Sequence, residues 1–444
     1  VVSGGVECNP GDPVLQDRLY LNDGKGLFTR ATEGTLPEMH DSGSVVNACD
    51  FDSDGDLDLF VGSRVIPGRY PLPPQSHLLR NDNGKFTDVT EALAPGLSKV
   101  GMVTGAIWSD TDNDNKTDLL ITCEWGPVRC FRNAGGKFEN QTSEAGLYNH
   151  WGWWNGIAGS DIDNDGDIDY AITNFGLNTK YHASMKKPTR IFYGDFGENG
   201  QLRVVEAEYE NDILYPVRGR SCSSHAMPFL FDKFDTFRGF ASAQLTDIYT
   251  PKTLSKSTQF AATELQSSIL INDGKGKFKF QPLPRITQIA PGFGLDFCDF
   301  NGDGNMDLYI LQNFHGPQAE TGHMAGGVSQ LLQGDGSGQF MPVSPNLSGL
   351  VAPGDAKSLT QTDLDGDGWM DFVLGINNDQ IMAFRNNNQT SNRPVTVRLL
   401  GKAGNPQAIG SRITIHLDNG TTRIAEVRAG AGYLSQSPSD CSFG

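Results

Sequence analysis

A nine-residue acidic pattern occurs five times in this chain of 444 residues. Each copy has an acidic or amide side chain at positions 1, 3, 5 and 9, and position 6 is Gly or Asn. Gly and Asn adopt positive φ more readily than other residues, so position 6 predicts a tight turn. We call the copies loops 1 to 5, and they span residues 50–58, 110–118, 161–169, 299–307 and 363–371. Such a repeat predicts one structural unit for each copy.

The loops have the composition of a calcium site. Ca²⁺ binds about six to eight oxygen atoms, and alternate side chains of a curled loop supply them together with a main-chain carbonyl near position 7. Mg²⁺ demands stricter octahedral geometry, so Ca²⁺ is the expected cofactor, with about five sites. A single loop of this kind could equally be a solvated turn, but five copies with one pattern favour the metal.

The expected ligands follow from the positions in each loop. The side-chain donors are Asp50, Asp52, Asp54, Asp58, Asp110, Asp112, Asp114, Asp118, Asp161, Asp163, Asp165, Asp169, Asp299, Asn301, Asp303, Asp307, Asp363, Asp365, Asp367 and Asp371. The main-chain carbonyl donors at position 7 are Asp56, Lys116, Asp167, Asn305 and Trp369.

The segments after the loops exclude an EF-hand, which needs a bidentate Glu at position 12 and a following helix. Here position 12 is Val, Ile or Leu in every copy, and apolar runs such as LFVGS and LYILQ follow the last Asp. These runs are rich in strand-forming residues and have no helix caps. The sequence therefore predicts that a β-strand follows each loop.

A second repeat lies between the loops and consists of an apolar strand, a tight turn and a short second strand. Its seven copies begin at Leu19, Leu78, Cys130, Ile191, Ile269, Leu331 and Ile381. Turns such as NDGKG are typical of β-hairpins, and each repeating unit has about the length of a four-stranded propeller blade. We therefore predict an all-β fold with a seven-bladed β-propeller and calcium-binding loops over residues 1–391. Its first blade is incomplete, its fifth has lost its loop, and an irregular insertion covers about residues 206–266.

These motifs resemble a known family. The DFDSDGDLD-type loops and LYLNDGKGLF-type hairpins resemble the FG-GAP/VCBS repeats of integrin α-subunit propellers and secreted bacterial proteins. Residues 395–436 resemble the ASPIC/UnbV domain, so residues 392–444 are expected to form a small, truncated C-terminal β domain. Together the two are similar to the cartilage acidic protein family. The resemblance implies extracellular calcium binding and adhesion-like interaction, and it supplies no catalytic residue. Asn115 and Lys116 depart from the common loop pattern, which predicts weaker metal binding at loop 2.

The net charge of the chain narrows the range of partners that it is expected to bind. The formal net charge is −18, and the five loops hold 21 of the 53 acidic residues. Bound Ca²⁺ would neutralise much of this charge, and an acidic surface disfavours nucleic acid. No apolar run approaches the ~20 residues of a membrane helix. The location that the family resemblance implies is extracellular, at the cell surface or periplasmic.

Two segments are candidate ligand sites with plainer alternatives. In the insertion, Arg218, Arg220, His225, Lys233 and Arg238 would form an anion or sugar site if they gather on one face. The favoured alternative is that the insertion packs its Phe residues against a blade and exposes its charges. The Trp residues of HWGWWNG at 150–156 would form either a sugar-stacking platform or, as favoured, inter-blade packing.

Other chemistry has little support in the sequence. Cys123 and Cys130 flank a Gly-Pro turn and would form a cross-strand disulfide if they face each other. His150, His182, His315 and His323 occur singly, without the spacing of a transition-metal motif. There is no G-x-S-x-G motif, no P-loop and no dinucleotide fingerprint.

The sequence thus favours a calcium-stabilised extracellular binding module that engages a protein or glycan. Two alternatives stay open: a structural subunit of an extracellular assembly, and a polysaccharide lyase-like propeller enzyme that uses the basic segment around residues 218–238.

Overall fold

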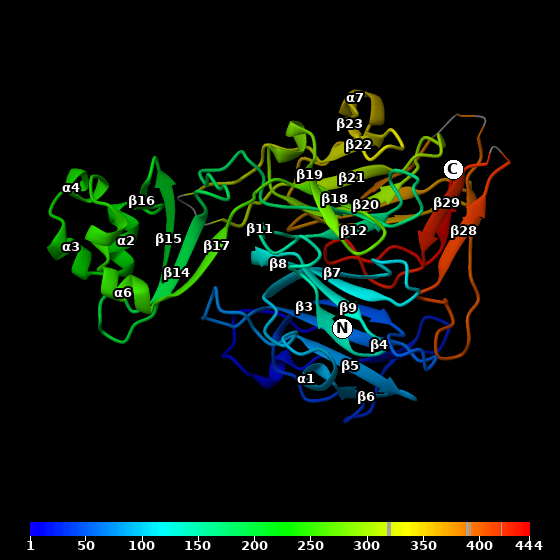
Figure 1. Cartoon of the computed structure of the whole chain (residues 1–444), viewed down its shortest axis with the longest axis horizontal. Coiled ribbons are helices and arrows are strands. Elements are labelled where there is room, and N and C mark those ends of the chain that lie inside the picture. Colours follow the sequence, from blue (N-terminus) through cyan, green and yellow to red (C-terminus); the bar gives the residue numbers. More distant parts are fainter. Residues whose placement is uncertain (318–320, 388–389, 391, 419) are drawn as a thin grey trace.

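The computed structural model describes residues 1–317, 321–387, 390, 392–418 and 420–444, and antiparallel sheets dominate it. Figure 1 shows these sheets side by side in a broad body, with a smaller module at one end of the long axis. Within the described residues, no helix is long and apolar enough to cross a membrane. The predicted all-β class is confirmed.

Each of the five loops joins the first two strands of one sheet. The loop 1 sheet contains β3 (Ser42–Cys49), β4 (Asp58–Val65), β5 (His77–Asp82) and β6 (Lys85–Asp88), and the loop 2 sheet contains β7 (Met102–Ser109), β8 (Asp118–Pro127), β9 (Arg129–Asn133) and β10 (Phe138–Asn140), with β11 (Trp151–Trp153) paired to β8. The loop 3 sheet contains β12 (Ile157–Ser160), β13 (Asp169–Ile172), β18 (Ser268–Asn272) and β19 (Phe278–Pro282), and the loop 4 sheet contains β20 (Gly292–Cys298), β21 (Asp307–Gln312), β22 (Gln330–Gly334) and β23 (Phe340–Pro342). The loop 5 sheet contains β24 (Ala356–Thr362), β25 (Asp371–Ile376) and β26 (Met382–Phe384). The strand predicted after each loop is confirmed, because it begins at position 9 in all five.

The hydrophobic core lies between successive sheets. Strand β8 shows how the alternation of its side chains builds this core: Leu119 and Ile121 join the cluster shared with the β3–β6 sheet, whereas Leu120 joins the cluster shared with the β12 sheet. Similar clusters fill the spaces between the β12 and β20 sheets and between the β20 and β24 sheets. Sheets that bury both faces in this way stack one after another, as the blades of a propeller do.

The blade predicted at Ile191 is wrong. Its hairpin, β14 (Thr189–Gly194) and β15 (Arg203–Glu210), forms a separate sheet with β16 (Ile213–Pro216) and β17 (Thr258–Ala262). The hairpin at Ile269 instead completes the sheet of loop 3, because β18 pairs with β13. Loop 3 therefore belongs to the same sheet as the hairpin at Ile269, which we expected to lack a loop. The described part contains five loop-bearing sheets and a two-stranded first unit, β1 (Tyr20–Asn22) with β2 (Phe28–Arg30).

The insertion is a module with its own core and begins earlier than predicted, at β14. Five short helices lie between β16 and β17: α2 (Arg220–Ala226), α3 (Phe229–Lys233), α4 (Phe237–Ala241), α5 (Leu245–Ile248) and α6 (Pro251–Lys256). Phe240 and Leu230 pack with Val205 and Ala207 of β15. The expectation that the Phe residues pack against a blade is wrong, since the module supplies strands for them to cover.

The C-terminal segment 429–437 passes along the first strands of the five sheets. Ala48 of β3 donates its N–H to Ala429 O, and Ile157 of β12 exchanges two backbone hydrogen bonds with Gly432, of 3.2 and 2.7 Å. Gly105 of β7 lies beside Gly432 O. On the far side, Ser437 Oγ donates to Asp296 of β20 at 2.6 Å, and Thr360 Oγ1 of β24 donates to Gln436 O at 3.0 Å. One segment therefore contacts all five sheets along their inner strands.

The remaining elements are short. They are β27 (Val395–Val397) paired with β30 (Cys441–Phe443), β28 (Arg412–His416) paired with β29 (Thr422–Glu426), the helices α1 (Thr90–Leu93) and α7 (Pro345–Ser348), and the 3₁₀ turns Pro13–Leu15 and Arg285–Gln288. Figure 1 places β28 and β29 at the end of the body opposite the module.

The disulfide considered between Cys123 and Cys130 does not form. Cys130 lies opposite Leu120 in the β8–β9 ladder, and side chains alternate between the faces of a strand. Cys123 therefore points to the other face of β8, and the two thiols lie in different hydrophobic clusters. All cysteines of the chain are free thiols in the structure.

Candidate metal centre

The five loops share one backbone conformation. Position 6 has positive φ in every copy, as predicted, with values from 63° at Asn115 to 99° at Gly55. Position 4 is also left-handed, with φ of 58° at Asn113 and 62° at Asn164, and this second turn was not predicted. Position 4 is Ser, Asn, Asn, Gly and Gly in loops 1 to 5. Because Asn and Gly adopt positive φ readily, this composition was the available signal for the second turn. Two left-handed residues curl each loop so that its odd-numbered side chains face inward.

The aspartate at position 9 fastens each loop to its own sheet. Asp58 accepts the N–H of Phe51 at position 2 (3.1 Å) and the N–H of Asn81 at the end of β5 (2.7 Å). Equivalent pairs of bonds are made by Asp118, Asp169 and Asp371, and Asp307 accepts the corresponding N–H of Gly334. All five position 9 side chains belong to buried residues. Position 9 is therefore a structural joint as well as a candidate ligand.

The residue that donates to position 9 also joins neighbouring sheets, a role that our sequence analysis missed. Asn133 Nδ2 donates to Phe51 O in loop 1, and Asn272 Nδ2 donates to Thr111 O in loop 2. Asn386 Nδ2 reaches Phe300 O in loop 4 in the same way. The Asn repeated at the start of four of the five hairpin turns, as in RNAGG and INDGK, was the available signal, and Gly334 takes its place in the fifth.

Carboxylates converge in four loops. In loops 1, 2 and 5, one oxygen from each of positions 1, 3 and 9 lies within 4.8 Å of the others, and in loop 3 the same holds for positions 1, 3 and 5. The residues are Asp50, Asp52 and Asp58; Asp110, Asp112 and Asp118; Asp363, Asp365 and Asp371; and Asp161, Asp163 and Asp165. Loop 4 has Asn301 at position 3, whose amide donates to Asp303 at 3.0 Å, and it forms no such group of three acids among the described residues.

Whether these loops fit a cation can be tested from the carboxylate oxygens that have no hydrogen-bond partner. Buried carboxylate oxygens without a hydrogen-bond donor occur at Asp52, Asp112, Asp161, Asp163, Asp167 and Asp307. Both carboxylate oxygens of Asp161 are buried and lack a hydrogen-bond donor. A buried carboxylate oxygen without a partner is costly, and a hard cation supplies the missing partner. The donor set is all oxygen, so the residues fit Ca²⁺.

Burial and mutual repulsion raise the pKa of several of these carboxyls. Desolvation, with smaller contributions from neighbouring acids, raises the pKa of Asp58 and Asp167 to about 7 and that of Asp169 and Asp307 to about 8. A nearby cation would reverse these shifts, because it favours the ionised form. The loops are therefore electrostatically strained when no cation neutralises them.

The side chains at position 7 differ between the loops. Asp56 accepts the N–H of Asn83 at 2.9 Å, whereas the Lys116 ammonium donates to Asp114 Oδ2 at 2.8 Å. The Asp167 carboxylate lies close enough to Asp163 and Asp165 for them to raise its pKa, so its side chain also belongs to the acidic cluster. Trp369 packs its ring near Gly302 of the preceding loop. The carbonyl ligand at this position stays a prediction.

Some loops have a cationic side chain beside their acids, and others do not. The residue in question directly precedes, in the sequence, the residue whose backbone N–H donates to position 9. Arg132 forms an ion pair with Asp112 in loop 2, and Arg385 Nη1 lies 3.2 Å from Asp365 in loop 5. In loop 4 the equivalent Gln333 donates to Asp303 at 3.2 Å. In loop 3 the equivalent residue is Ile271, which offers no charge.

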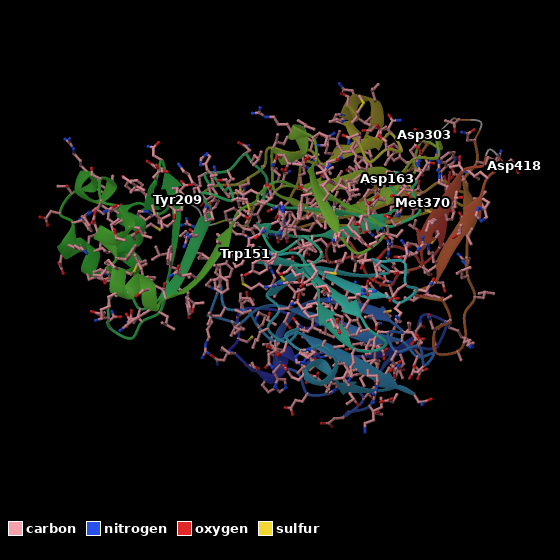
Figure 2. The ribbon with its side chains drawn as sticks, in the orientation of Figure 1. Trp151, Asp163, Tyr209, Asp303, Met370 and Asp418 are labelled. Atoms are coloured by element: carbon pink, nitrogen blue, oxygen red, sulfur yellow. The ribbon has the colours of Figure 1, made fainter. Side chains whose placement is uncertain are left out.

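The C-terminal strands lie over the loops. Glu426 of β29 accepts the N–H of Asp110 at 3.0 Å and the Ser109 hydroxyl at 2.6 Å. Arg412 of β28 donates to Asn113 Oδ1 in loop 2 and to Gly166 O in loop 3. Figure 2 shows the labelled Asp163 and Asp303 on the side of the body near these strands, with Tyr209 marking the module at the other end. The candidate metal sites and the module therefore occupy opposite ends of the molecule.

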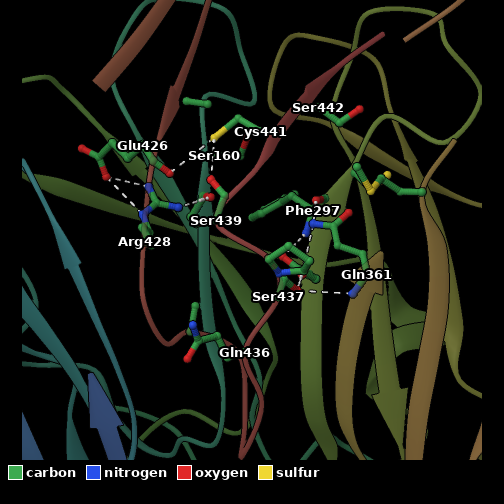
Figure 3. Close-up of a pocket in the computed structure, with 18 of the residues that line it drawn as sticks. Ser160, Phe297, Gln361, Glu426, Arg428, Gln436, Ser437, Ser439, Cys441 and Ser442 are labelled. Carbon is green, nitrogen blue, oxygen red and sulfur yellow. Dashed lines mark hydrogen bonds and ion pairs between the residues drawn. The ribbon is translucent and has the colours of Figure 1, made fainter. Parts of the chain in front are cut away.

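A small pocket separates the C-terminal segment from β20 and β24. Its cavity of about 140 Å³ is lined by Gln361, Glu426, Arg428, Ser437 and Cys441 among others. Figure 3 shows Arg428 paired with Glu426 and Ser437 near Gln361. Arg428 also donates to Gly159 O at 2.7 Å, so its charge is used within the fold.

The other residues singled out in the sequence serve mostly structural roles. Trp154 is fully buried, and Trp153 stacks on Phe175 with ring centroids 4.2 Å apart, so the packing interpretation of these two is confirmed. His315 and His323, which match no metal-binding motif in the sequence, stack on each other with their ring centroids 4.6 Å apart. They form no group of three metal-binding side chains in the part of the chain that the structure describes.

The basic residues of the insertion do not gather at one point. Arg218 pairs with Glu206 at 2.7 Å, and Lys233 donates to Ile248 O at 3.0 Å. His225 hydrogen-bonds Ser221 O at 2.6 Å. Arg220 shares α2 with His225, and both lie against the Phe231 ring, whereas Arg238 is on α4.

Parts of the chain match the models of two protein families. The FG-GAP-like repeat matches residues 6–61, 110–172 and 259–310, and the ASPIC and UnbV family matches residues 401–444. The second repeat match ends before the module, and the third begins in the last strand of the module, β17.

Among individual proteins, the chain is similar to cartilage acidic protein 1. It is 27% identical to the Mus musculus protein over 198 residues and 26% identical to the Homo sapiens protein over 197 residues, which is 42% of this chain in each case. The chain spans only 28% of the length of these relatives. A solved structure of the V. cholerae biofilm matrix protein Bap1 aligns with 93% of this chain and 62% of its own, at 10% identity and a TM-score of 0.26. That score carries no argument about this protein.

Proposed function

We propose that this protein is a calcium-stabilised extracellular binding module of adhesion type, in which Ca²⁺ holds the loops of a β-propeller and the exposed surfaces engage a protein or glycan. The observation that carries the proposal is the set of buried, unpartnered carboxylate oxygens that recurs in the acidic loops. The FG-GAP-like repeats and the similarity to cartilage acidic protein 1 support an extracellular, cell-surface or periplasmic location.

The proposed role of Ca²⁺ is structural. When bound, the ion would neutralise the carboxylates of positions 1, 3 and 5 and complete the coordination of their unpartnered oxygens. The chain's own residues supply the rest of the arrangement: the left-handed residues at positions 4 and 6 curl the loop, and position 9 anchors it to the sheet. Because the acids repel each other without a cation, metal binding contributes directly to folding free energy.

No specific observation favours a lyase. Arg218 and His225, the groups considered for such chemistry, are engaged with Glu206 and Ser221 O. The alternative of a structural subunit of an extracellular assembly gains no support from residues 429–437, because they are held among the inner strands of the sheets.

The test is a calcium titration of the purified full chain after chelation, followed by calorimetry and thermal unfolding. We expect about five ions per chain with dissociation constants on the order of 10⁻⁴ to 10⁻³ M, and a melting temperature that rises with occupancy. A melting temperature that millimolar Ca²⁺ leaves unchanged would contradict the proposal.

A further inference from the structure

The tip of the module holds an arginine between two exposed aromatic rings. The Arg220 guanidinium carbon lies 5.4 Å from the ring centroid of Phe231 and 5.2 Å from that of Phe237. These three residues come from α2, α3 and α4, so three short helices converge to build the arrangement. In Figure 1 these helices form the outer end of the module, away from the body. We call Arg220, Phe231 and Phe237 the aromatic clamp.

The guanidinium is fixed in place while part of it stays available. Arg220 Nε donates to Phe234 O at 2.7 Å, which fixes the plane of the group. Among the described residues, neither Nη atom of Arg220 has a hydrogen-bond partner. A planar guanidinium with two free Nη groups recognises a carboxylate or sulfate through paired hydrogen bonds, and the fixed orientation lowers the entropy cost of binding.

The rings beside it are open to solvent. Phe237 is 64% exposed and Phe231 is 40% exposed, although Phe234 and Phe240 of the same helices pack inside the module. Folding has therefore buried some aromatic rings of this segment and left the two that flank Arg220 outside. Exposed aromatic rings beside a polar anchor are typical of ligand surfaces, where a flat partially apolar group stacks on them.

The charge of the segment complements an anion. Residues 218–256 hold six Lys or Arg and three Asp, in a chain whose net charge is −18. Arg218 and Lys252 form ion pairs with Glu206 and Glu198, whereas Arg220 and Arg238 form no ion pair among the described residues. Arg238 on α4 is exposed, and no hydrogen bond or ion pair of its side chain occurs within the described residues. A cationic tip on an acidic protein attracts acidic polymers and repels other copies of the same acidic body.

We propose that the aromatic clamp binds an acidic polysaccharide, with Arg220 holding a carboxylate or sulfate and Phe231 and Phe237 stacking on the sugar ring. The inference rests on the proposed function, since it names the partner class of the binding module and the surface that takes it. A glycan fits better than an acidic peptide because a pyranose ring offers both a flat apolar face and a ring-borne anion.

The experiment measures binding of the calcium-loaded full chain by calorimetry. The probes are polygalacturonate oligosaccharides, chondroitin sulfate oligosaccharides, neutral dextran oligosaccharides and a poly-glutamate peptide. We expect the acidic oligosaccharides to bind with an affinity that falls as salt rises, and the dextran not to bind. Two variants test the surface: Phe237→Ser removes an exposed ring, and Arg220→Lys keeps the charge but removes the paired geometry. Each should weaken binding at least about tenfold.

Matched controls keep the result interpretable. Leu347→Ser removes an 84% exposed apolar side chain on α7, and Arg30→Lys makes the same charge-conserving change on exposed β2, so both should bind as the parent does. Far-UV spectra and melting temperatures of all variants exclude unfolding as the cause. Equal binding by parent and clamp variants, no binding of either acidic oligosaccharide, or tighter binding of poly-glutamate would overturn the inference. A calcium-dependent melting temperature without glycan binding would leave the proposed function standing, and glycan binding without calcium stabilisation would do the reverse.

Discussion

Loops 2 and 3 share a backbone and differ in how their negative charge is balanced. In loop 2, Lys116 donates to Asp114 at 2.8 Å and Arg132 pairs with Asp112, so two cations of the chain itself lie among the acids. In loop 3, position 7 is Asp167 and the residue equivalent to Arg132 is Ile271, so the acidic cluster has neither cation. Four of the buried oxygens without partners belong to loop 3, against one in loop 2. The same repeat thus includes a loop whose acids are balanced by cations of the chain and a loop whose acids have no such cation beside them.

The largest expected effect is the loss of one ligand from loop 3. Asp163→Ala should lower the free energy of unfolding in Ca²⁺ by about 2 kcal/mol, because it removes a ligand and leaves the other acids uncompensated. Asp112→Ala, at the same position of loop 2, should cost less than about 1 kcal/mol, since Lys116 still balances Asp114. Denaturant unfolding of both variants with and without Ca²⁺ measures the difference. Equal losses would show that the two loops bind the ion alike.

Ile271→Arg should convert loop 3 toward the loop 2 arrangement. The new guanidinium would occupy the position that Arg132 holds in the neighbouring sheet. We expect calorimetry to count one calcium fewer per chain, with higher stability in chelator than the parent protein has. Arg132→Ile is the matched reverse change and should make the stability of loop 2 depend more strongly on Ca²⁺. An unchanged ion count for Ile271→Arg would mean that this residue does not determine the difference.

The two loops should also differ in their dependence on pH. In the metal-free protein, burial and neighbouring acids raise the pKa of Asp161 to about 6, of Asp167 to about 7 and of Asp169 to about 8. These folded-state pKa values exceed the ordinary value, so the folded chain binds more protons than the unfolded one, and stability in chelator should fall as pH rises from about 4 to about 8.

Calcium replaces those protons, so its affinity for loop 3 should rise between pH 6 and pH 8. Loop 2 should contribute less, because Lys116 lowers the pKa of Asp114 and the pKa of Asp118 reaches only about 6. Melting temperatures in chelator across this range, and proton release on calcium binding, measure both effects. Asp167→Asn should flatten the pH profile of the metal-free protein, and a profile as steep as that of the parent would contradict the assignment.

The smallest expected effect belongs to Lys116→Ala. Lys116 is 45% exposed at its side chain, and ion pairs that water reaches contribute little. Removing it should leave the stability in chelator nearly unchanged and tighten calcium binding at loop 2 slightly. Titrations of this variant and of Lys137→Ala, a lysine outside the loop, provide the comparison. A large stabilisation in Ca²⁺ would mean that Lys116 alone blocks the site.

The sequence predicts much of this arrangement because local patterns encode it. The spacing of acids, the Gly or Asn at position 6 and the apolar runs after each loop predict the turns and strands, and these are confirmed. The blade at Ile191 was mispredicted because the hairpin pattern does not reveal which strand a hairpin pairs with, and β18 lies far along the chain from β13. Arg132 beside loop 2 and Glu426 beside Ser109 were missed for the same reason, since such contacts arise only when distant segments pack together.

The path of residues 429–437 sets the order in which the molecule can be completed. Ala48 is synthesised long before its hydrogen-bond acceptor, Ala429. The sheets that precede this segment cannot satisfy their inner edges until it has been synthesised, so assembly of the centre follows formation of the sheets. A ribosome stalled before this segment would carry sheets with open inner edges, which are targets for chaperones. Residues 429–437 therefore act as a checkpoint for the folding of the sheets that precede them.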